Sequence, residues 1–116
     1  MIRYGSNTRN KFGARKFRNE WGEWASKAEF WRFAELLEMQ RKGLINGLQR
    51  QVKYVLIPAQ REDKKLIERE CSYYADFVYI RDGEQVVEDT KGVRTPEYII
   101  KRKLMLYVHK IRIKEV

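Results

Sequence analysis

The sequence predicts an α/β protein in which a central mixed β-sheet carries helices on its faces. Three observations support this: an early segment with helical apolar spacing, a pair of aromatic and β-branched segments joined by Asp82-Gly83, and a second helical segment followed by an alternating C-terminus. A chain of 116 residues has the size of one domain. We divide it into a basic N-terminal arm at 1–19 and a single domain at 20–116.

The first helix is predicted at about 26–42. Ser26 and Glu29 have the spacing of a capping box, in which each side chain accepts a backbone N–H at the start of a helix. Apolar residues then recur at helical spacing, with Trp31 inside the pattern and therefore assigned to the core. Gly43 follows two basic residues and ends the helix.

The middle of the chain predicts strands. Two short strands are expected at 44–49 and 52–57, and Pro58 ends the second. The charged segment 60–70 is either a loop or an exposed strand extension. Residues 72–80 are aromatic and β-branched, as strands are.

The second half predicts a hairpin, a helix and a final strand. Asp82-Gly83 is a strong signal for a two-residue hairpin turn, which makes 85–90 the returning strand. Thr95 or Pro96 begins a helix that runs to about Tyr107. The alternating residues 110–116 form the last strand.

The hairpin register places two acidic side chains opposite each other. With a two-residue loop, Asp76 faces Asp89, and directly opposed side chains lie about 4.5–5.5 Å apart at Cβ. Lys91 points to the same face, whereas Glu88 points to the other. Opposed carboxylates destabilise a sheet unless a divalent cation such as Mg²⁺ binds both. The alternative is that both are strand-end charges facing water, with Lys91 neutralising one of them.

The net charge of +9, from 25 Lys and Arg against 16 Asp and Glu, favours an anionic partner. Nucleic acid is the first candidate and an anionic membrane surface the second. No apolar run reaches the length of a membrane span, and the single cysteine indicates a reducing compartment, so we expect a cytoplasmic protein. The expected phosphate contacts are Arg15, Lys16, Arg18, Lys101 and Lys103.

Residues 74–79 (YADFVY) and 86–92 (VVEDTKG) resemble the signature of the PD-(D/E)xK nuclease superfamily, with Ala75 at the position of its proline. The resemblance covers about 10–116 and is closest to a small phage-associated family long catalogued as a domain of unknown function. It implies a restriction-endonuclease-like sandwich and, for a phage-encoded protein, the host cell cytoplasm.

The same resemblance implies the site. Asp76 and Asp89 would bind Mg²⁺ or Mn²⁺, Lys91 would be the catalytic lysine, and Glu29 would complete the acidic set from the first helix. The capping box offers Glu29 a purely structural role instead. Gln49 or Gln51 is a further candidate to approach a metal-bound water.

The expected function is a metal-dependent deoxyribonuclease, an endonuclease of phage origin that hydrolyses phosphodiester bonds of DNA. Branched DNA, single-stranded DNA and RNA all remain open as substrates. Cleavage of a branched substrate, as by a Holliday-junction resolvase, would need two active sites and hence a homodimer. The alternatives are a non-catalytic nucleic-acid-binding protein on the same fold and a scaffold protein that uses its aromatic residues as an interface.

Overall fold

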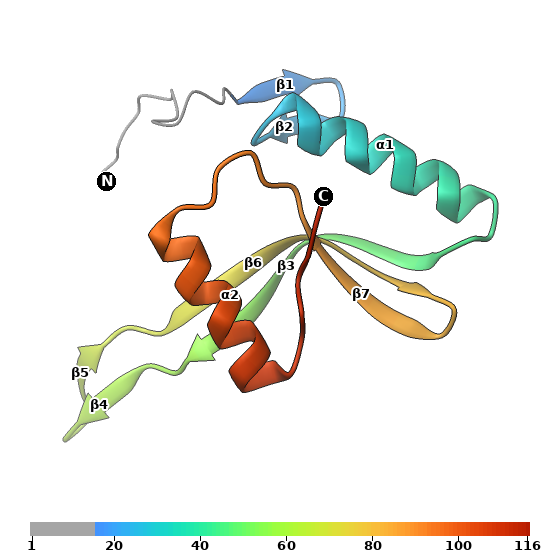
Figure 1. The fold of residues 1–116 in the computed structure, drawn as a ribbon. Coiled ribbons are helices and arrows are strands. Elements are labelled where there is room, and N and C mark those ends of the chain that lie inside the picture. Colours follow the sequence, from blue (N-terminus) through green and yellow to red (C-terminus); the bar gives the residue numbers. More distant parts are fainter. Residues whose placement is uncertain (1–15) are drawn as a thin grey trace.

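The computed structural model describes residues 16–116 (Figure 1). Its first element is a small antiparallel hairpin of β1 (Phe17–Asn19) and β2 (Gly22–Trp24). The predicted arm therefore ends in a strand, and its residues 1–15 lie outside the described part of the chain.

Helix α1 (Lys27–Arg41) follows the hairpin and confirms the first predicted helix. The Ser26 side chain caps it by accepting the backbone N–H of Glu29 at 3.1 Å. Gly43 follows the helix with φ of 81°, a left-handed conformation that glycine adopts without steric cost.

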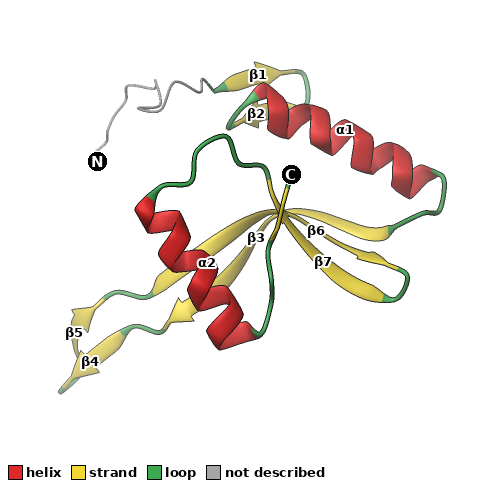
Figure 2. Cartoon of the chain, in the orientation of Figure 1, coloured by secondary structure: helices red, strands yellow, loops and turns green. Residues whose placement is uncertain are grey.

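Four strands form the central sheet, in the order β3–β6–β7–β8. They are β3 (Asn46–Ile57), β6 (Cys71–Arg81), β7 (Glu84–Asp89) and β8 (Lys114–Glu115). Adjacent strands are antiparallel except β7 and β8, which are parallel, so the sheet is mixed. With α1 and α2 (Pro96–His109), the fold is mixed α/β, as the sequence predicts (Figure 2).

The prediction of two short strands at 44–49 and 52–57 is wrong, because one strand, β3, spans both. The polar pair Arg50-Gln51 interrupts the apolar pattern of the sequence. The pairing with β6 nevertheless continues on both sides, with Arg50 opposite Phe77 and Val52 opposite Ala75. After β3, a separate hairpin of β4 (Gln60–Glu62) and β5 (Lys65–Glu68) projects beyond the central sheet (Figure 1). The segment 60–70 is therefore an exposed strand extension.

The predicted hairpin register is confirmed. Asp82 and Gly83 form the two-residue turn with φ of 53° and 79°, and Val78 pairs with Val87. The last strand is shorter than the predicted 110–116, because Lys110 adopts a left-handed conformation that caps α2 and redirects the chain before β8.

Two apolar clusters divide the molecule. One contains Leu36 of α1 and Phe77 of β6, and the other contains Tyr98 and Met105 of α2 together with Ala75 of β6. Asp76 therefore lies on β6 at the boundary between the cluster under α1 and the cluster under α2.

The burial of the tryptophans differs from the sequence prediction. Trp31, assigned to the core from its spacing, is 62% exposed, and Trp21 is also exposed. Trp24 of β2 is buried and takes the core position beside α1, packing against Phe30 and Phe33.

Glu88 points away from Asp89, as predicted, and is fully buried beneath α1. Arg32 of α1 binds it through two hydrogen bonds, Nε to Oε1 at 2.9 Å and Nη2 to Oε2 at 2.7 Å, and the Tyr79 hydroxyl donates to Oε2. This contact joins α1 to β7. Within 16–116, neither helix is long and apolar enough to cross a membrane.

Candidate active site

Asp76 and Asp89 lie on adjacent strands at the end of the hairpin ladder. The last hydrogen-bonded pair of the ladder is Phe77 with Glu88, and the next residues along this register are Asp76 and Asp89. Asp89 is 3% exposed, and Asp76 is half-buried. Burial and the negative charge of Asp89, with a smaller effect of Glu29, raise the pKa of Asp76 to about 8. The three carboxylates are therefore close enough to interact electrostatically.

The amide of Gln51 connects two of these carboxylates. Its Nε2 donates to Oε2 of Glu29 at 3.0 Å and to Oδ1 of Asp76 at 3.2 Å. Gln51 has φ of 51°, which is uncommon for a residue other than glycine and is often found at functional sites. Glu29 also accepts the backbone N–H of Ala25 at 2.9 Å, so its capping role and its place beside Asp76 coexist.

The carboxylate of Asp89 is held by a tyrosine and a lysine. The Tyr73 hydroxyl donates to Oδ2, and Nζ of Lys91 lies 3.1 Å from Oδ1. The Lys91 ammonium also lies 4.1 Å from the centroid of the Tyr98 ring, a cation–π distance. Burial and Asp89 raise the pKa of Tyr73 well above its usual value, so Tyr73 remains a hydrogen-bond donor.

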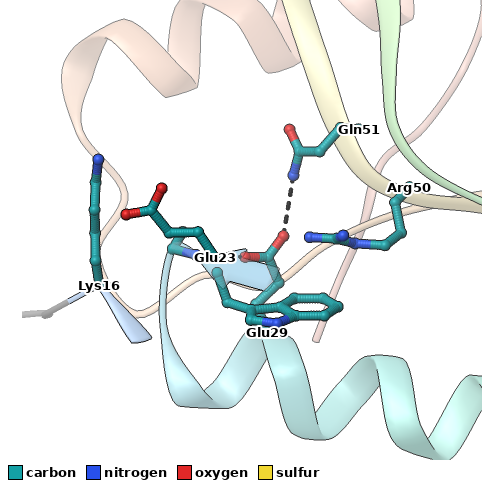
Figure 3. Close-up of a pocket in the computed structure, with 7 residues that line it drawn as sticks. Lys16, Glu23, Glu29, Arg50 and Gln51 are labelled. Atoms are coloured by element: carbon teal, nitrogen blue, oxygen red, sulfur yellow. Dashed lines mark hydrogen bonds between the residues drawn. The ribbon is translucent and has the colours of Figure 1, made fainter. Parts of the chain in front are cut away.

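A cleft of about 380 Å³ opens onto this arrangement. Asp76, Asp89 and Lys91 line it, together with Lys101 of α2. Glu29 and Gln51 line a neighbouring cleft of about 250 Å³, shown in Figure 3. The structure thus brings Asp76, Asp89 and Lys91 into one cleft and links Glu29 to them through Gln51.

Glu29, Asp76 and Asp89 do not together form a three-ligand metal site in this structure. Among residues 16–116, no group of three or more His, Cys, Asp or Glu side chains has the arrangement of a metal site. The Gln51 amide lies between Glu29 and Asp76. The pair Asp76 and Asp89 still fits a hard cation. Burial and the charge of Asp89 raise the pKa of Asp76, and a cation that replaces the proton offsets both effects.

The predicted phosphate contacts are dispersed. Lys101 reaches the main cleft, where it pairs with Glu97 at 3.4 Å, whereas Lys103 is exposed on α2. Lys16 lines the neighbouring cleft, and Arg18 pairs with Glu23 at 3.7 Å. Arg15 lies outside the described residues.

Sequence reasoning missed Tyr73 and Arg50. By strand alternation, Tyr73 would point to the face opposite Asp76, yet its hydroxyl reaches Asp89. In the β3–β6 ladder, Gln51 and Asp76 do not form a pair. The alternation of side chains between the two faces of the sheet is therefore interrupted at these two residues. No sequence signal distinguishes Tyr73 from the other aromatic residues of β6.

No curated protein and no solved structure matches the chain. The model of a family described as "Protein of unknown function (DUF1064)" matches residues 9–115, which is nearly the whole chain and includes every site residue described above. The chain therefore belongs to the DUF1064 family.

Proposed function

We propose that this protein is a metal-dependent nuclease that hydrolyses phosphodiester bonds of DNA on a restriction-endonuclease-like fold. The observation that carries the proposal is the opposed pair Asp76 and Asp89 in a cleft that also holds Lys91 and Lys101. Two crowded carboxylates beside two lysines suit a divalent cation and a phosphate group together.

The two aspartates and two lysines of the cleft each have a role under this proposal. Mg²⁺ or Mn²⁺ held by Asp76 and Asp89 would polarise a phosphoryl oxygen and lower the pKa of a bound water. The Lys91 ammonium, fixed between Asp89 and the Tyr98 ring, stabilises negative charge that develops on the phosphate. Lys101 attracts the phosphate into the cleft.

Glu29 and Gln51 act as positioning residues. Gln51 ties the Asp76 carboxylate to Glu29, which is itself fixed at the start of α1 by the N–H of Ala25. Thr90 holds the other oxygen of Asp76 through its backbone N–H at 2.8 Å. Asp76 is therefore oriented before any ligand arrives, which lowers the cost of binding.

One observation favours a second candidate, a nucleic-acid-binding protein without catalysis. Both oxygens of Asp76 and both oxygens of Asp89 already accept a hydrogen bond or an ion pair from the protein. A cation would have to compete with these partners. This candidate predicts DNA binding without cleavage at every metal concentration.

The test is cleavage of labelled junction, duplex and single-stranded DNA in Mg²⁺, Mn²⁺ or EDTA. We expect the wild type to cleave at least one substrate with metal and none in EDTA, and Asp89→Asn to be inactive. Calorimetry with Mn²⁺ should show binding by the wild type and a large loss in Asp89→Asn.

The matched control is Glu97→Gln, which removes an exposed carboxylate from the same cleft and should keep metal binding. Equal Mn²⁺ binding by the wild type and Asp89→Asn would refute the metal site. DNA binding without cleavage in any metal would favour the second candidate.

A further inference from the structure

The neighbouring cleft lies against the proposed metal site and has its own chemistry. Arg50 and Gln51 of β3, Glu29 of α1 and Trp24 of β2 line it (Figure 3). Its volume of about 250 Å³ corresponds to roughly eight waters at about 30 Å³ each, so it has room for a small oxyanion and part of its hydration shell. Glu29 and Gln51 connect this cleft to Asp76.

Aromatic rings contact the Arg50 guanidinium in this cleft. Its guanidinium carbon lies 3.5 Å from the centroid of the Trp24 ring and 5.6 Å from that of Phe33. Trp24 is buried, and its indole N–H donates to the Asn19 side chain at 3.2 Å. Stacking covers one face of the guanidinium, and hydrogen bonds from its N–H groups lie in the guanidinium plane, away from the Trp24 ring.

These N–H groups have no acceptor in the described chain. Nε of Arg50 is buried without a hydrogen-bond partner, and within 16–116 no carboxylate forms an ion pair with Arg50. Arg32 and Arg102, the other half-buried arginines of this part of the chain, both bind a glutamate. Nε is enclosed by the protein, so a ligand in the cleft would accept hydrogen bonds from the Nη groups of Arg50, which have no acceptor within 16–116.

The acidic residues around Arg50 are already engaged. Glu29 accepts from Ala25 through Oε1 and from Gln51 through Oε2, and Glu23 pairs with Arg18. Lys16 and Arg50 approach the cleft from different sides (Figure 3). The side chains that still have donors to offer are therefore basic, and an oxyanion is the ligand that they suit.

We propose that Arg50 binds a phosphate group of the DNA strand, next to the phosphate that would enter the cleft of Lys91 and Lys101. This inference rests on the proposed function, because it places two phosphates of one strand in adjacent clefts. Arg50 directly precedes Gln51, whose amide reaches Asp76, so β3 carries a residue for each cleft. The planar fork of arginine matches two phosphate oxygens, and the stack on Trp24 orients it beforehand.

The first test measures DNA binding in EDTA by fluorescence anisotropy with labelled single-stranded and duplex oligonucleotides. Arg50→Gln should lose about tenfold or more in affinity, as expected for a hydrogen bond between charged groups. Its plot of log K against log salt on duplex DNA should flatten by about 0.9. Arg50→Lys should lose less, because it keeps the charge and loses only the fork.

The matched control is Arg61→Gln, which removes one charge from an exposed position on β4. We expect it to bind DNA as the wild type does. A tenfold loss in Arg61→Gln as well would mean that the Arg50 effect is only one of net charge, and would overturn the site.

The second test locates the contact on the strand. A neutral methylphosphonate replaces one phosphate of the oligonucleotide at a time. The wild type should lose affinity at one particular position, and Arg50→Gln should be insensitive there, since the partner is already missing. A purely structural role of Arg50 would leave the sensitivity profile unchanged and would overturn the proposal.

Urea unfolding of both variants checks their stability. If Arg50→Gln does not fold, Arg50→Met, which also removes the charge, takes its place in both tests. Wild-type affinity and salt slope in the folded variant would overturn the contact. Because all of these measurements use EDTA, absence of cleavage with metal would refute the nuclease and leave the Arg50 result standing.

Discussion

At the scale of single residues, Lys91 combines partial burial, two defined contacts and access to the cleft. It is half-buried, and its ammonium lies between the Asp89 carboxylate and the Tyr98 ring at the edge of the cleft. Most of the other lysines in the described part of the chain are exposed. A half-buried ammonium that faces both a carboxylate and an open cleft is placed to meet a phosphate.

We therefore expect Lys91→Ala to lose cleavage activity by about 10²-fold or more, as happens when one donor to a developing oxyanion is removed. The melting temperature should change by only a few degrees, because Asp89 keeps its bond from Tyr73. Lys103→Ala, at an exposed position on α2, serves as the control and should cleave normally. A Lys91→Ala protein with wild-type activity would remove Lys91 from the mechanism.

At the scale of secondary-structure elements, β7 carries two buried carboxylates that point to opposite faces of the sheet. Asp89 faces the cleft, and Glu88 lies under α1 with Arg32 and Tyr79. Burial raises the pKa of Glu88, but the hydrogen bonds from Arg32 and Tyr79 outweigh it, and the net pKa is lowered. Glu88 is thus a charged structural residue, and Asp89 is the candidate ligand.

Arg32→Met should destabilise the protein by about 3–5 kcal/mol, since it leaves the buried Glu88 charge without its partner. The double variant Arg32→Met/Glu88→Met should recover part of this loss, because both charges are then absent. Urea unfolding measures both values. Arg41→Met, which breaks an exposed pair with Glu38 on the same helix, should have a much smaller effect. Equal losses in the two single variants would contradict this account.

The short strand β8 is fixed by Glu115. Its Oε1 accepts from Arg94 at 2.7 Å, and its Oε2 accepts from Tyr98 at 2.7 Å and from Arg102 at 3.2 Å. Hydrogen bonds from Arg94 and Tyr98 lower the pKa of Glu115 to about 2. One carboxylate therefore joins the end of the sheet to α2 and to the loop before it.

This lowered pKa predicts an acid-labile contribution to stability. The folded state favours the charged form, so the contribution is complete above the ordinary value of 4.5 and disappears as the pH falls towards 2. Glu115→Gln should lower the urea midpoint at pH 6 and show a smaller further decrease between pH 4.5 and 2. Glu84→Gln, at the exposed turn, should follow the wild type. Parallel curves for the wild type and Glu115→Gln would refute the role of Glu115.

Local signals predicted the helices and the hairpin, because a few adjacent residues determine them. Ser26 and Glu29 specify the start of α1, and Asp82-Gly83 specifies the register that places Asp76 opposite Asp89. The continuity of β3 depends on pairing with the distant β6, so the polar pair at 50–51 concealed it. The contact of Tyr73 with Asp89 depends in the same way on the interrupted pairing of β3 with β6 at Gln51 and Asp76, which alternation along one strand does not encode.

At the scale of the whole molecule, basic residues surround the two clefts from different elements. Lys101 comes from α2, Lys16 and Arg18 from the region around β1, and Arg50 from β3. With the net charge of +9, this arrangement predicts attraction of DNA that does not depend on its sequence.

Replacing Arg15, Lys16 and Arg18 with alanine should weaken binding to every DNA sequence alike, and flatten log K against log salt by up to about 0.9 per lost contact on duplex DNA. Cleavage at saturating DNA should persist, because Lys16 and Arg18 do not line the cleft of Asp76 and Asp89. Alanine at Arg61, Lys64 and Lys65 removes the same charge from the projecting hairpin and serves as the control. Identical behaviour of the two triple variants would show that only net charge matters.

The two-residue turn at Asp82-Gly83 also determines where the chain can tolerate a change in length. One inserted residue at this turn would shift the ladder, and each side chain of β7 would exchange faces. Asp89 would then point under α1, and Glu88 would point into the cleft. The turn at Asp63-Lys64 between β4 and β5 has no such constraint, since its hairpin projects away from the sheet (Figure 1). Insertions and fused tags therefore belong at the β4–β5 tip, and the β6–β7 turn must keep its length.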